Sequence, residues 1–365
     1  MDGSNLFNLM QIPEVSENKN YWIIRTNSGD FYDDFILHQY IAISWDYITV
    51  SMLNNKKEDD LKRIIEGYEK SSPTPDKDDD DDDDGSSKSK ITSIYNKLYR
   101  FVFEISKGDI VLIPSRNSDK ITIAEVTGDV YEDDNYVSQY LHENPTTELT
   151  LCPYFKRRKI NTLKTIPKSK LDIYLAKGFN SQHALSNMNE YAPYINRSIY
   201  DIYSTKNEIH STIHAGHPNG ISLKELANLI NCLNSIVDNI STQCDLDISE
   251  NDIQVKLNIH SPGLIEMIGF GLAAGISVSI ILFTINHLIN GGKFELKFTH
   301  DENGKINFSA SSESKGLRGT QNEAKALELK GQEQLCNIIK ELDIKNPELI
   351  ESTFLKDKSD DNKKE

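Results

Sequence analysis

Cysteine is scarce in this sequence. The 365 residues contain four cysteines, which are widely spaced and form no CxxC pair. This spacing argues against a zinc ribbon and a disulfide framework, and it is compatible with a reducing cytosol. Glycine (19 residues) and proline (11 residues) are too few for a collagen-like or proline-rich scaffold.

Familiar catalytic motifs are also missing. No P-loop, GxSxG, HExxH or GxGxxG motif occurs in a strand-to-helix context. Cys152 precedes Pro153 and has no histidine close by in sequence, so we interpret it as a buried thiol rather than a nucleophile. We therefore expect a non-enzymatic protein without a cofactor, and an enzyme with no recognisable motif remains an alternative.

Three histidines offer one metal hypothesis. His210, His214 and His217 are spaced i, i+4 and i+7, which on a helix would place three imidazoles on one face. Gly216 and Pro218 would end a helix there, so we favour a polar loop and expect no metal site.

The chain is acidic, with a formal net charge of -16. Seven of the negative charges form one run, residues 78–84, inside a segment (71–90) that we expect to be a disordered insertion. Contact with nucleic acid would need a local basic patch, because phosphate affinity comes from Lys and Arg. The strongest such patch is Lys156, Arg157, Arg158 and Lys159, with a merely solvated surface segment as the alternative.

The first half of the chain has an α+β pattern. Runs rich in β-branched and aromatic residues predict strands at 21–26 and 40–45, and a hairpin at 108–114 and 121–128. Apolar residues at helical spacing predict helices at 58–70 and 91–102. We expect a small mixed barrel over residues 1–168.

A helical region is expected over residues 169–245. Ser222 and Glu225 have the spacing of a capping box, in which each side chain satisfies a backbone N–H of the first helical turn. The helix that follows should bury one apolar stripe, formed by Leu223, Leu226, Ile230, Leu233 and Val237.

One long apolar run lies in the last part, residues 246–365. Residues 267–285 carry no charge, and as a helix they would span about 28 Å, close to the thickness of a bilayer core. Gly271 and Gly275 have the GxxxG spacing that lets helices approach in lipid, so a homo-oligomer is one expectation. We expect a single-pass membrane helix, with a buried helix of a soluble, cytoplasmic protein as the alternative. A β-hairpin and a further helix should follow it.

The aromatic residues suggest a ligand site. Both tryptophans, Trp22 and Trp45, lie in the first unit, as does Tyr131. Aromatic faces can stack on a flipped or single-stranded base, and Arg25 or Asn27 could read its edge. The alternative is that the tryptophans are core residues.

Five segments carry a resemblance to a known family. They are YWIIRT (21–26), GDFYDDF (29–35), IAISW (41–45), GDIVLIP (108–114) and IAEVTG (123–128). Together they resemble the N-terminal EVE/PUA-like domains of modification-dependent restriction proteins and other prokaryotic defence proteins. Ser44 stands where glycine is usual in that pattern, and no nuclease motif follows.

The resemblance implies recognition of a modified base, a nucleotide or a similar small ligand. Combined with the apolar run, it leads us to expect a membrane-associated sensor or accessory protein, of the kind used in phage defence. The alternative is a soluble defence subunit whose apolar helix is buried against a partner.

Overall fold

The chain folds into two compact units. The N-terminal unit is Asn18–Ile199, and the C-terminal unit is Tyr200–Glu365 together with Met1–Glu17. The computed structural model describes residues 12–71, 84–179, 183–216, 221–244, 246–249, 251–258, 263–290, 293–300, 306–313, 326–327 and 332–347. For 84–87, 243–244, 258, 293–300, 306–313, 326–327 and 332–333 it describes the backbone alone.

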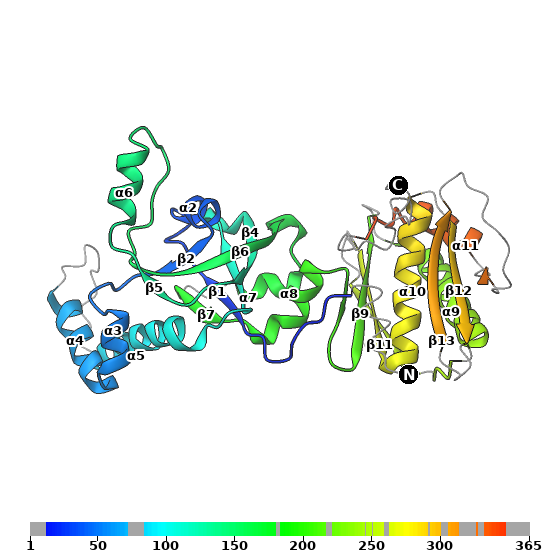
Figure 1. Cartoon of the computed structure of the whole chain (residues 1–365), viewed down its shortest axis with the longest axis horizontal. Coiled ribbons are helices and arrows are strands. Elements are labelled where there is room, and N and C mark those ends of the chain that lie inside the picture. Colours follow the sequence, from blue (N-terminus) through cyan, green and yellow to red (C-terminus); the bar gives the residue numbers. More distant parts are fainter. Residues whose placement is uncertain are drawn as a thin grey trace, which may run out of the picture. The chain divides into compact units, whose positions relative to one another are not determined.

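The N-terminal unit is built on a curled sheet of seven described strands (Figure 1). The strand order is β2-β6-β4-β3-β1-β7, with β5 paired to β6. The β1–β3 pair is parallel and the other pairs are antiparallel. The strands are β1 (Tyr21–Ile24), β2 (Tyr40–Ile43), β3 (Ile110–Pro114), β4 (Lys120–Val126), β5 (Tyr131–Glu132), β6 (Lys156–Pro167) and β7 (Leu185–Asn187).

Helices lie between these strands in the chain. They are α2 (Tyr32–Leu37), α3 (Val50–Asn55), α4 (Glu58–Ser71), α5 (Asp84–Tyr99), α6 (Tyr136–Glu143), α7 (Ile173–Gly178) and α8 (Ala192–Ile199). A π-helical turn, Arg100–Glu104, continues α5. This arrangement confirms the expected α+β class and the two main strands, the hairpin and the helix at 58–70.

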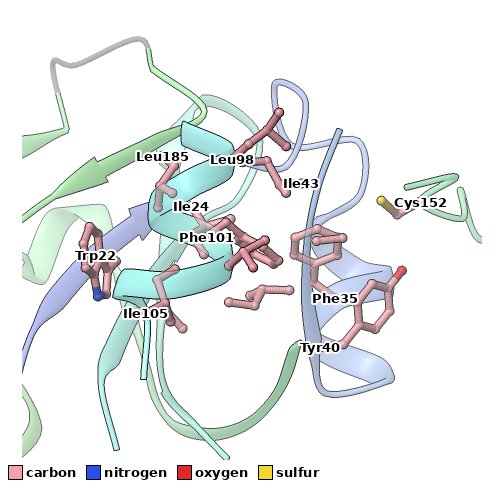
Figure 2. Close-up of a cluster of buried hydrophobic side chains, with 14 of the residues drawn as sticks. Trp22, Ile24, Phe35, Tyr40, Ile43, Leu98, Phe101, Ile105, Cys152 and Leu185 are labelled. Atoms are coloured by element: carbon pink, nitrogen blue, oxygen red, sulfur yellow. The ribbon is translucent and has the colours of Figure 1, made fainter. Parts of the chain in front are cut away.

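Apolar side chains cover both faces of the sheet, because successive residues of a strand point to opposite sides. Trp22 and Ile24 belong to one buried cluster, whereas Tyr21 and Ile23 belong to the other. The first cluster also takes in α2, α4 and α5, and Figure 2 shows Trp22 and Leu98 within it. The second cluster takes in α7 and α8.

The segment expected to be a disordered acidic insertion (71–90) is helical at both of its ends. α4 ends at Ser71, α5 begins at Asp84, and residues 72–83 lie outside the described residues. Lys90 pairs with Glu69 of α4 at 2.7 Å, so α5 has a contact on the N-terminal side of its apolar stripe. The expected helix start at residue 91 is therefore wrong by about two turns.

The C-terminal unit contains a four-stranded antiparallel sheet in the order β10-β11-β9-β8. Its strands are β8 (Ile202–Ser204), β9 (Glu208–Ala215), β10 (Ile253–Asn258) and β11 (Gly263–Phe270). A three-stranded sheet has the order β13-β12-β14. It comprises β12 (Lys293–His300), β13 (Ile306–Glu313) and β14 (Ala326–Leu327). The helices are α9 (Leu223–Cys244), α10 (Gly271–Ile289) and α11 (Gln332–Glu341).

The expected helical region over 169–245 is wrong in part. It contains β7, β8 and β9 as well as α7, α8 and α9, and the N-terminal unit runs past residue 168 to Ile199. His210 and His214 lie on strand β9, and His217 lies outside the described residues. The expected polar loop is therefore wrong for His210 and His214. On β9 the buried Ile209 and Ile213 alternate with the histidines, a period of two that indicates a strand.

Helix α9 begins at the predicted capping box. The backbone N–H of Ser222 donates to Glu225 Oε2 at 2.7 Å, and the N–H of Glu225 donates to Ser222 Oγ at 3.2 Å. The predicted stripe is wrong in part: Leu223 is 84% exposed and Ile230 is 36% exposed, whereas Leu233 is buried and Val237 packs against the core. The fully buried residues of the helix are Leu229, Cys232, Leu233, Ile236 and Ile240.

The apolar run is divided between a strand and a helix. Met267–Phe270 end β11, and α10 starts at Gly271, whose φ of +74° suits glycine. α10 contacts β9 and β11, and also α9, α11 and β12 (Figure 1). It is the one described helix long and apolar enough to cross a membrane. In its most apolar stretch of 18 residues, 67% of the residues are buried.

One glycine of the run, Gly269, allows close packing within the unit. A Cβ at Gly269 would lie 2.6 Å from the backbone of Ala274, so the strand and the first turn of α10 can approach only because Gly269 has no side chain. Gly275 is buried, whereas Gly271 is exposed. The two residues of the GxxxG pair therefore do not share one exposed face.

Candidate ligand site around Trp45

Trp45 follows β2 in an unusual backbone conformation. Its φ is +64°, in the left-handed region that a bulky residue adopts only under constraint. Its carbonyl oxygen accepts the N–H of Ile48 at 3.0 Å, which closes a tight turn. The indole is half-buried against the apolar cluster of the N-terminal unit, so part of its surface remains accessible.

Lys156 of β6 stabilises this turn through hydrogen bonds. Its ammonium group is fully buried and donates to the Trp45 carbonyl oxygen and to Asp46 Oδ1, each at 3.0 Å. Asp46 Oδ1 also accepts the N–H of Phe155 at 3.0 Å. Burial lowers the pKa of Lys156, and the carboxylate of Asp46 opposes this effect. The turn is thus fixed by an ion pair between the buried Lys156 and the partly buried Asp46.

The flank of the turn is aromatic and packed. Tyr47 stacks on Tyr68 of α4 with ring centroids 4.2 Å apart and an interplanar angle of 6°. The Tyr47 hydroxyl donates to Glu69 Oε1 at 3.3 Å. Burial raises the pKa of Tyr47 above its ordinary value. These contacts fix Tyr47 as a support of the turn.

A cleft of about 510 Å³ lies between α5 and β7. Its lining residues are Lys88, Ser89, Thr92, Ser93, Asn96, Lys97, Arg100, His183, Leu185, Ser186 and Asn187. Lys97 connects this cleft to the turn, because its ammonium nitrogen lies 5.7 Å from the centroid of the Trp45 ring. The Trp45 face and the cleft are therefore neighbouring parts of one surface region.

The other residues that the sequence suggested for the ligand site have structural contacts. Trp22 is 2% exposed and donates its indole N–H to Asp109 Oδ2 at 3.0 Å, so it is a core residue. Arg25 donates to the carbonyl oxygen of Phe179 at 2.6 Å. Asn27 has a φ of +51° in its own turn. Tyr131 lies half-buried on β5, opposite Arg157. Of this set, the partly exposed Trp45 is the residue whose ring lies beside a cleft.

The expected basic patch is wrong. Lys156, Arg157 and Arg158 are 0%, 1% and 4% exposed, and only Lys159 faces solvent. Arg158 donates to the carbonyl oxygens of Phe101 (2.9 Å) and Val102 (2.8 Å) in the π-helical turn. Cations that satisfy buried carbonyl groups in this way cannot also collect phosphates at the surface.

Arg157 belongs to a second buried polar cluster, which the sequence did not reveal. Its guanidinium donates to the carbonyl oxygens of Tyr154 and Cys152 at 2.9 and 2.8 Å. It also stacks on the rings of Tyr40 and Tyr136, at 4.3 and 3.8 Å from their centroids. The cluster therefore joins β6 to β2 and to helix α6.

Asp34 of α2 is the acceptor at the centre of this cluster. One oxygen accepts from His38 Nδ1 at 2.8 Å and from the Tyr136 hydroxyl at 2.5 Å. The other accepts from the Tyr40 hydroxyl and from the N–H of Cys152, the latter at 2.7 Å. Burial raises the pKa of the Cys152 thiol to about 12, which keeps it protonated at neutral pH.

Histidine ligands for a metal do not assemble on β9. His210 lies between Glu266 Oε1 at 3.2 Å and Glu208 Oε2 at 3.0 Å, and it stacks on Tyr203 with centroids 4.5 Å apart. Within the described ranges, no group of three or more His, Cys, Asp or Glu side chains could hold a metal ion. His210 is thus an internal polar link between β9 and β11.

Comparison with known proteins gives one similarity. No curated protein and no solved structure matches this chain significantly. Residues 20–182 match the model of a family described as a domain of unknown function (DUF8426). That match starts just before β1 and includes the Trp45 turn and helix α5, whereas His183 and β7, on the other side of the cleft, lie just beyond it.

Proposed function

We propose that the N-terminal unit is a binding module for a planar, base-like ligand, with Trp45 as the stacking face. The observation that carries this proposal is the left-handed backbone of Trp45, held by the buried ammonium group of Lys156. Strain of this kind is retained where the surrounding structure fixes a side chain for use. A partly exposed indole offers a base a large π-face.

The EVE/PUA-like segments support the same class of ligand, because that resemblance implies recognition of a base or nucleotide. One of those segments, residues 41–45, ends at Trp45 itself. Binding is favoured over nucleophilic catalysis at Cys152, since a buried thiol with a pKa of about 12 supplies little thiolate.

A variant with a single tryptophan tests this proposal. Trp22→Phe leaves Trp45 as the only tryptophan in the full chain, so its emission reports the site directly. We expect adenosine or 5-methylcytidine to quench this emission in a saturable manner. Calorimetry with Trp45→Leu should show loss of nucleoside binding while the thermal unfolding midpoint stays within a few degrees of wild type. Equal nucleoside binding by wild type and Trp45→Leu would refute the proposal.

For helix α10 we propose the role of a core helix in a soluble protein, rather than a membrane span. This is supported by twelve buried residues between Ala274 and Ile285 and by contacts with two strands of one sheet and two helices. Length and composition alone are equally suited to a bilayer. Fractionation of expressing cells decides between them: recovery in the high-speed supernatant without detergent is expected, and extraction only with detergent would favour the anchored form.

A further inference from the structure

The cleft between α5 and β7 has an unusual charge for this chain. Eleven residues line it, none is acidic, and Lys88, Lys97 and Arg100 are cations. The whole protein carries a formal net charge of -16, so the positive charge of the cleft is opposite in sign to that of the protein as a whole. Arg100 has a loose contact with Glu104 at 3.7 Å, but Glu104 does not line the cleft.

Neutral hydrogen-bonding groups accompany the cations. Thr92 and Ser93 face the cleft from α5, and Ser186 faces it from β7. Among the described strands β7 pairs with β1 alone, so it forms one edge of the sheet. Hydroxyl groups and backbone N–H groups commonly accompany Lys and Arg in phosphate binding.

Lys97 gives this cleft a direct relation to the Trp45 face. Its ammonium group lies over the indole, and Lys97 is also one of the residues that line the cleft. Burial lowers the pKa of Lys97, because the charged form loses solvation there. An anion bound beside Lys97 would compensate for that loss.

We infer that the α5–β7 cleft binds a phosphate group of the ligand whose planar part stacks on Trp45. This inference rests on the proposed function, and it adds that the ligand is phosphorylated. The phosphate belongs either to a mononucleotide or to a single-stranded nucleic acid, and both would place the same chemistry next to Lys88, Lys97 and Arg100.

The test compares charged and uncharged probes on the full chain. The double variant Lys88→Gln/Arg100→Gln removes two cations from the cleft and leaves the Lys97–Trp45 contact in place. The control Arg63→Gln/Lys107→Gln removes the same charge from exposed positions that do not line the cleft. A second cleft variant, Ser93→Asp, keeps all the cations and adds one negative charge.

The probes are adenosine, AMP and a fluorescein-labelled single-stranded oligonucleotide. We expect Lys88→Gln/Arg100→Gln to weaken binding of AMP or of the oligonucleotide by about tenfold, and to make the salt dependence of oligonucleotide binding shallower. Ser93→Asp should weaken the same binding, whereas the control should not. Adenosine binding should be unchanged in all three variants. AMP binding stronger than oligonucleotide binding indicates a mononucleotide, and the reverse indicates a strand.

The two proposals can fail independently, and different binding results would show each failure. If adenosine and AMP bind equally and neither cleft variant changes AMP or oligonucleotide binding, the phosphate inference is overturned and the Trp45 site stands. If phosphorylated probes bind through the cleft but Trp45→Leu has no effect, the stacking proposal fails and only the anion site remains. If none of the probes binds at millimolar concentration, both are overturned.

Discussion

The ammonium nitrogen of Lys156 lies 3.0 Å from the carbonyl oxygen of Trp45 and is completely buried. The two residues are far apart in sequence, and antiparallel pairing of β2 with β6 brings them together. Lys156, which the sequence suggested as part of a basic surface patch, is therefore a buried residue whose hydrogen bonds fix the Trp45 turn.

Removal of the Lys156 ammonium group should affect both the stability of the N-terminal unit and ligand binding at Trp45. Lys156→Met keeps an unbranched apolar side chain but leaves the partly buried Asp46 carboxylate without its cation. We expect a loss of about 2–4 kcal/mol in the free energy of unfolding, together with weaker ligand quenching at Trp45. Urea denaturation measures the first effect, and the neighbouring exposed Lys159→Met should change little. Equal stability of Lys156→Met and Lys159→Met would contradict a stabilising role for the buried ammonium group.

Asp34 should be the most sensitive carboxylate of the N-terminal unit. In Asp34→Asn an amide NH2 group would replace one oxygen that now accepts two hydrogen bonds. We expect a cost of roughly 2–4 kcal/mol in the free energy of unfolding, and faster amide hydrogen exchange in α6, which Tyr136 attaches to Asp34. Asp33→Asn is the matched control, because Asp33 is exposed. Unaltered exchange in residues 136–143 would show that α6 is held by other contacts.

Alkaline pH should destabilise the N-terminal unit through Tyr40 and Tyr136. Burial raises the pKa of both hydroxyls, and their hydrogen bonds to Asp34 raise it further. The native state therefore keeps protons that the unfolded chain releases, so the stabilisation is complete below about pH 10 and is lost as the pH rises above it. Lys156 opposes this trend, because its pKa is lowered in the native state.

The tyrosine contribution is isolated by comparing variants. Free energies of unfolding measured at about pH 8 and about pH 10.5 should fall more steeply with pH for wild type than for Tyr40→Phe/Tyr136→Phe. Tyr174→Phe serves as a control, since Tyr174 is about half exposed. The same slope in all three proteins would exclude these two hydroxyls as the cause.

Truncation of apolar side chains in α9 should cost stability according to their position on the helix rather than their residue type. Leu229 and Ile236 are fully buried, so Leu229→Ala or Ile236→Ala should cost about 2–5 kcal/mol. Leu223→Ala removes the same kind of side chain from an exposed position and should cost less than about 0.5 kcal/mol. Thermal or urea unfolding measures the difference, and similar costs at Leu223 and Leu229 would place the buried face elsewhere.

Features with local causes could be predicted from the sequence. Strand β1 and the β3–β4 hairpin follow from β-branched residues bounded by turn residues. The capping box of Ser222 and Glu225 needs only a spacing of three residues, and both of its hydrogen bonds are present. Trp45 was among the predicted ligand residues, although its left-handed backbone and its neighbour Lys97 gave no signal in the sequence.

Other features depended on partners distant in the chain. Apolarity alone did not show that residues 267–285 change from strand to helix at Gly271, because both structures can bury such a run. The exposure of Lys156, Arg157 and Arg158 was mispredicted for a similar reason. The acceptors of Lys156 and Arg158, which are Asp46 and the carbonyl groups of Phe101 and Val102, come from distant segments of the chain. Arg157 donates to the nearby carbonyl groups of Cys152 and Tyr154, but the rings of Tyr40 and Tyr136 that cover it are distant in sequence.

By itself, the sequence determined the secondary structure that short-range rules govern: the periodicity of strands, the first turn of α9 and the α+β class. The tertiary structure alone decided which cations are buried, which face of α9 is covered and which aromatic ring lies beside a cleft. The physical reason is that a polar group can be buried only where acceptors or opposite charges meet it, and folding brings those partners from remote positions.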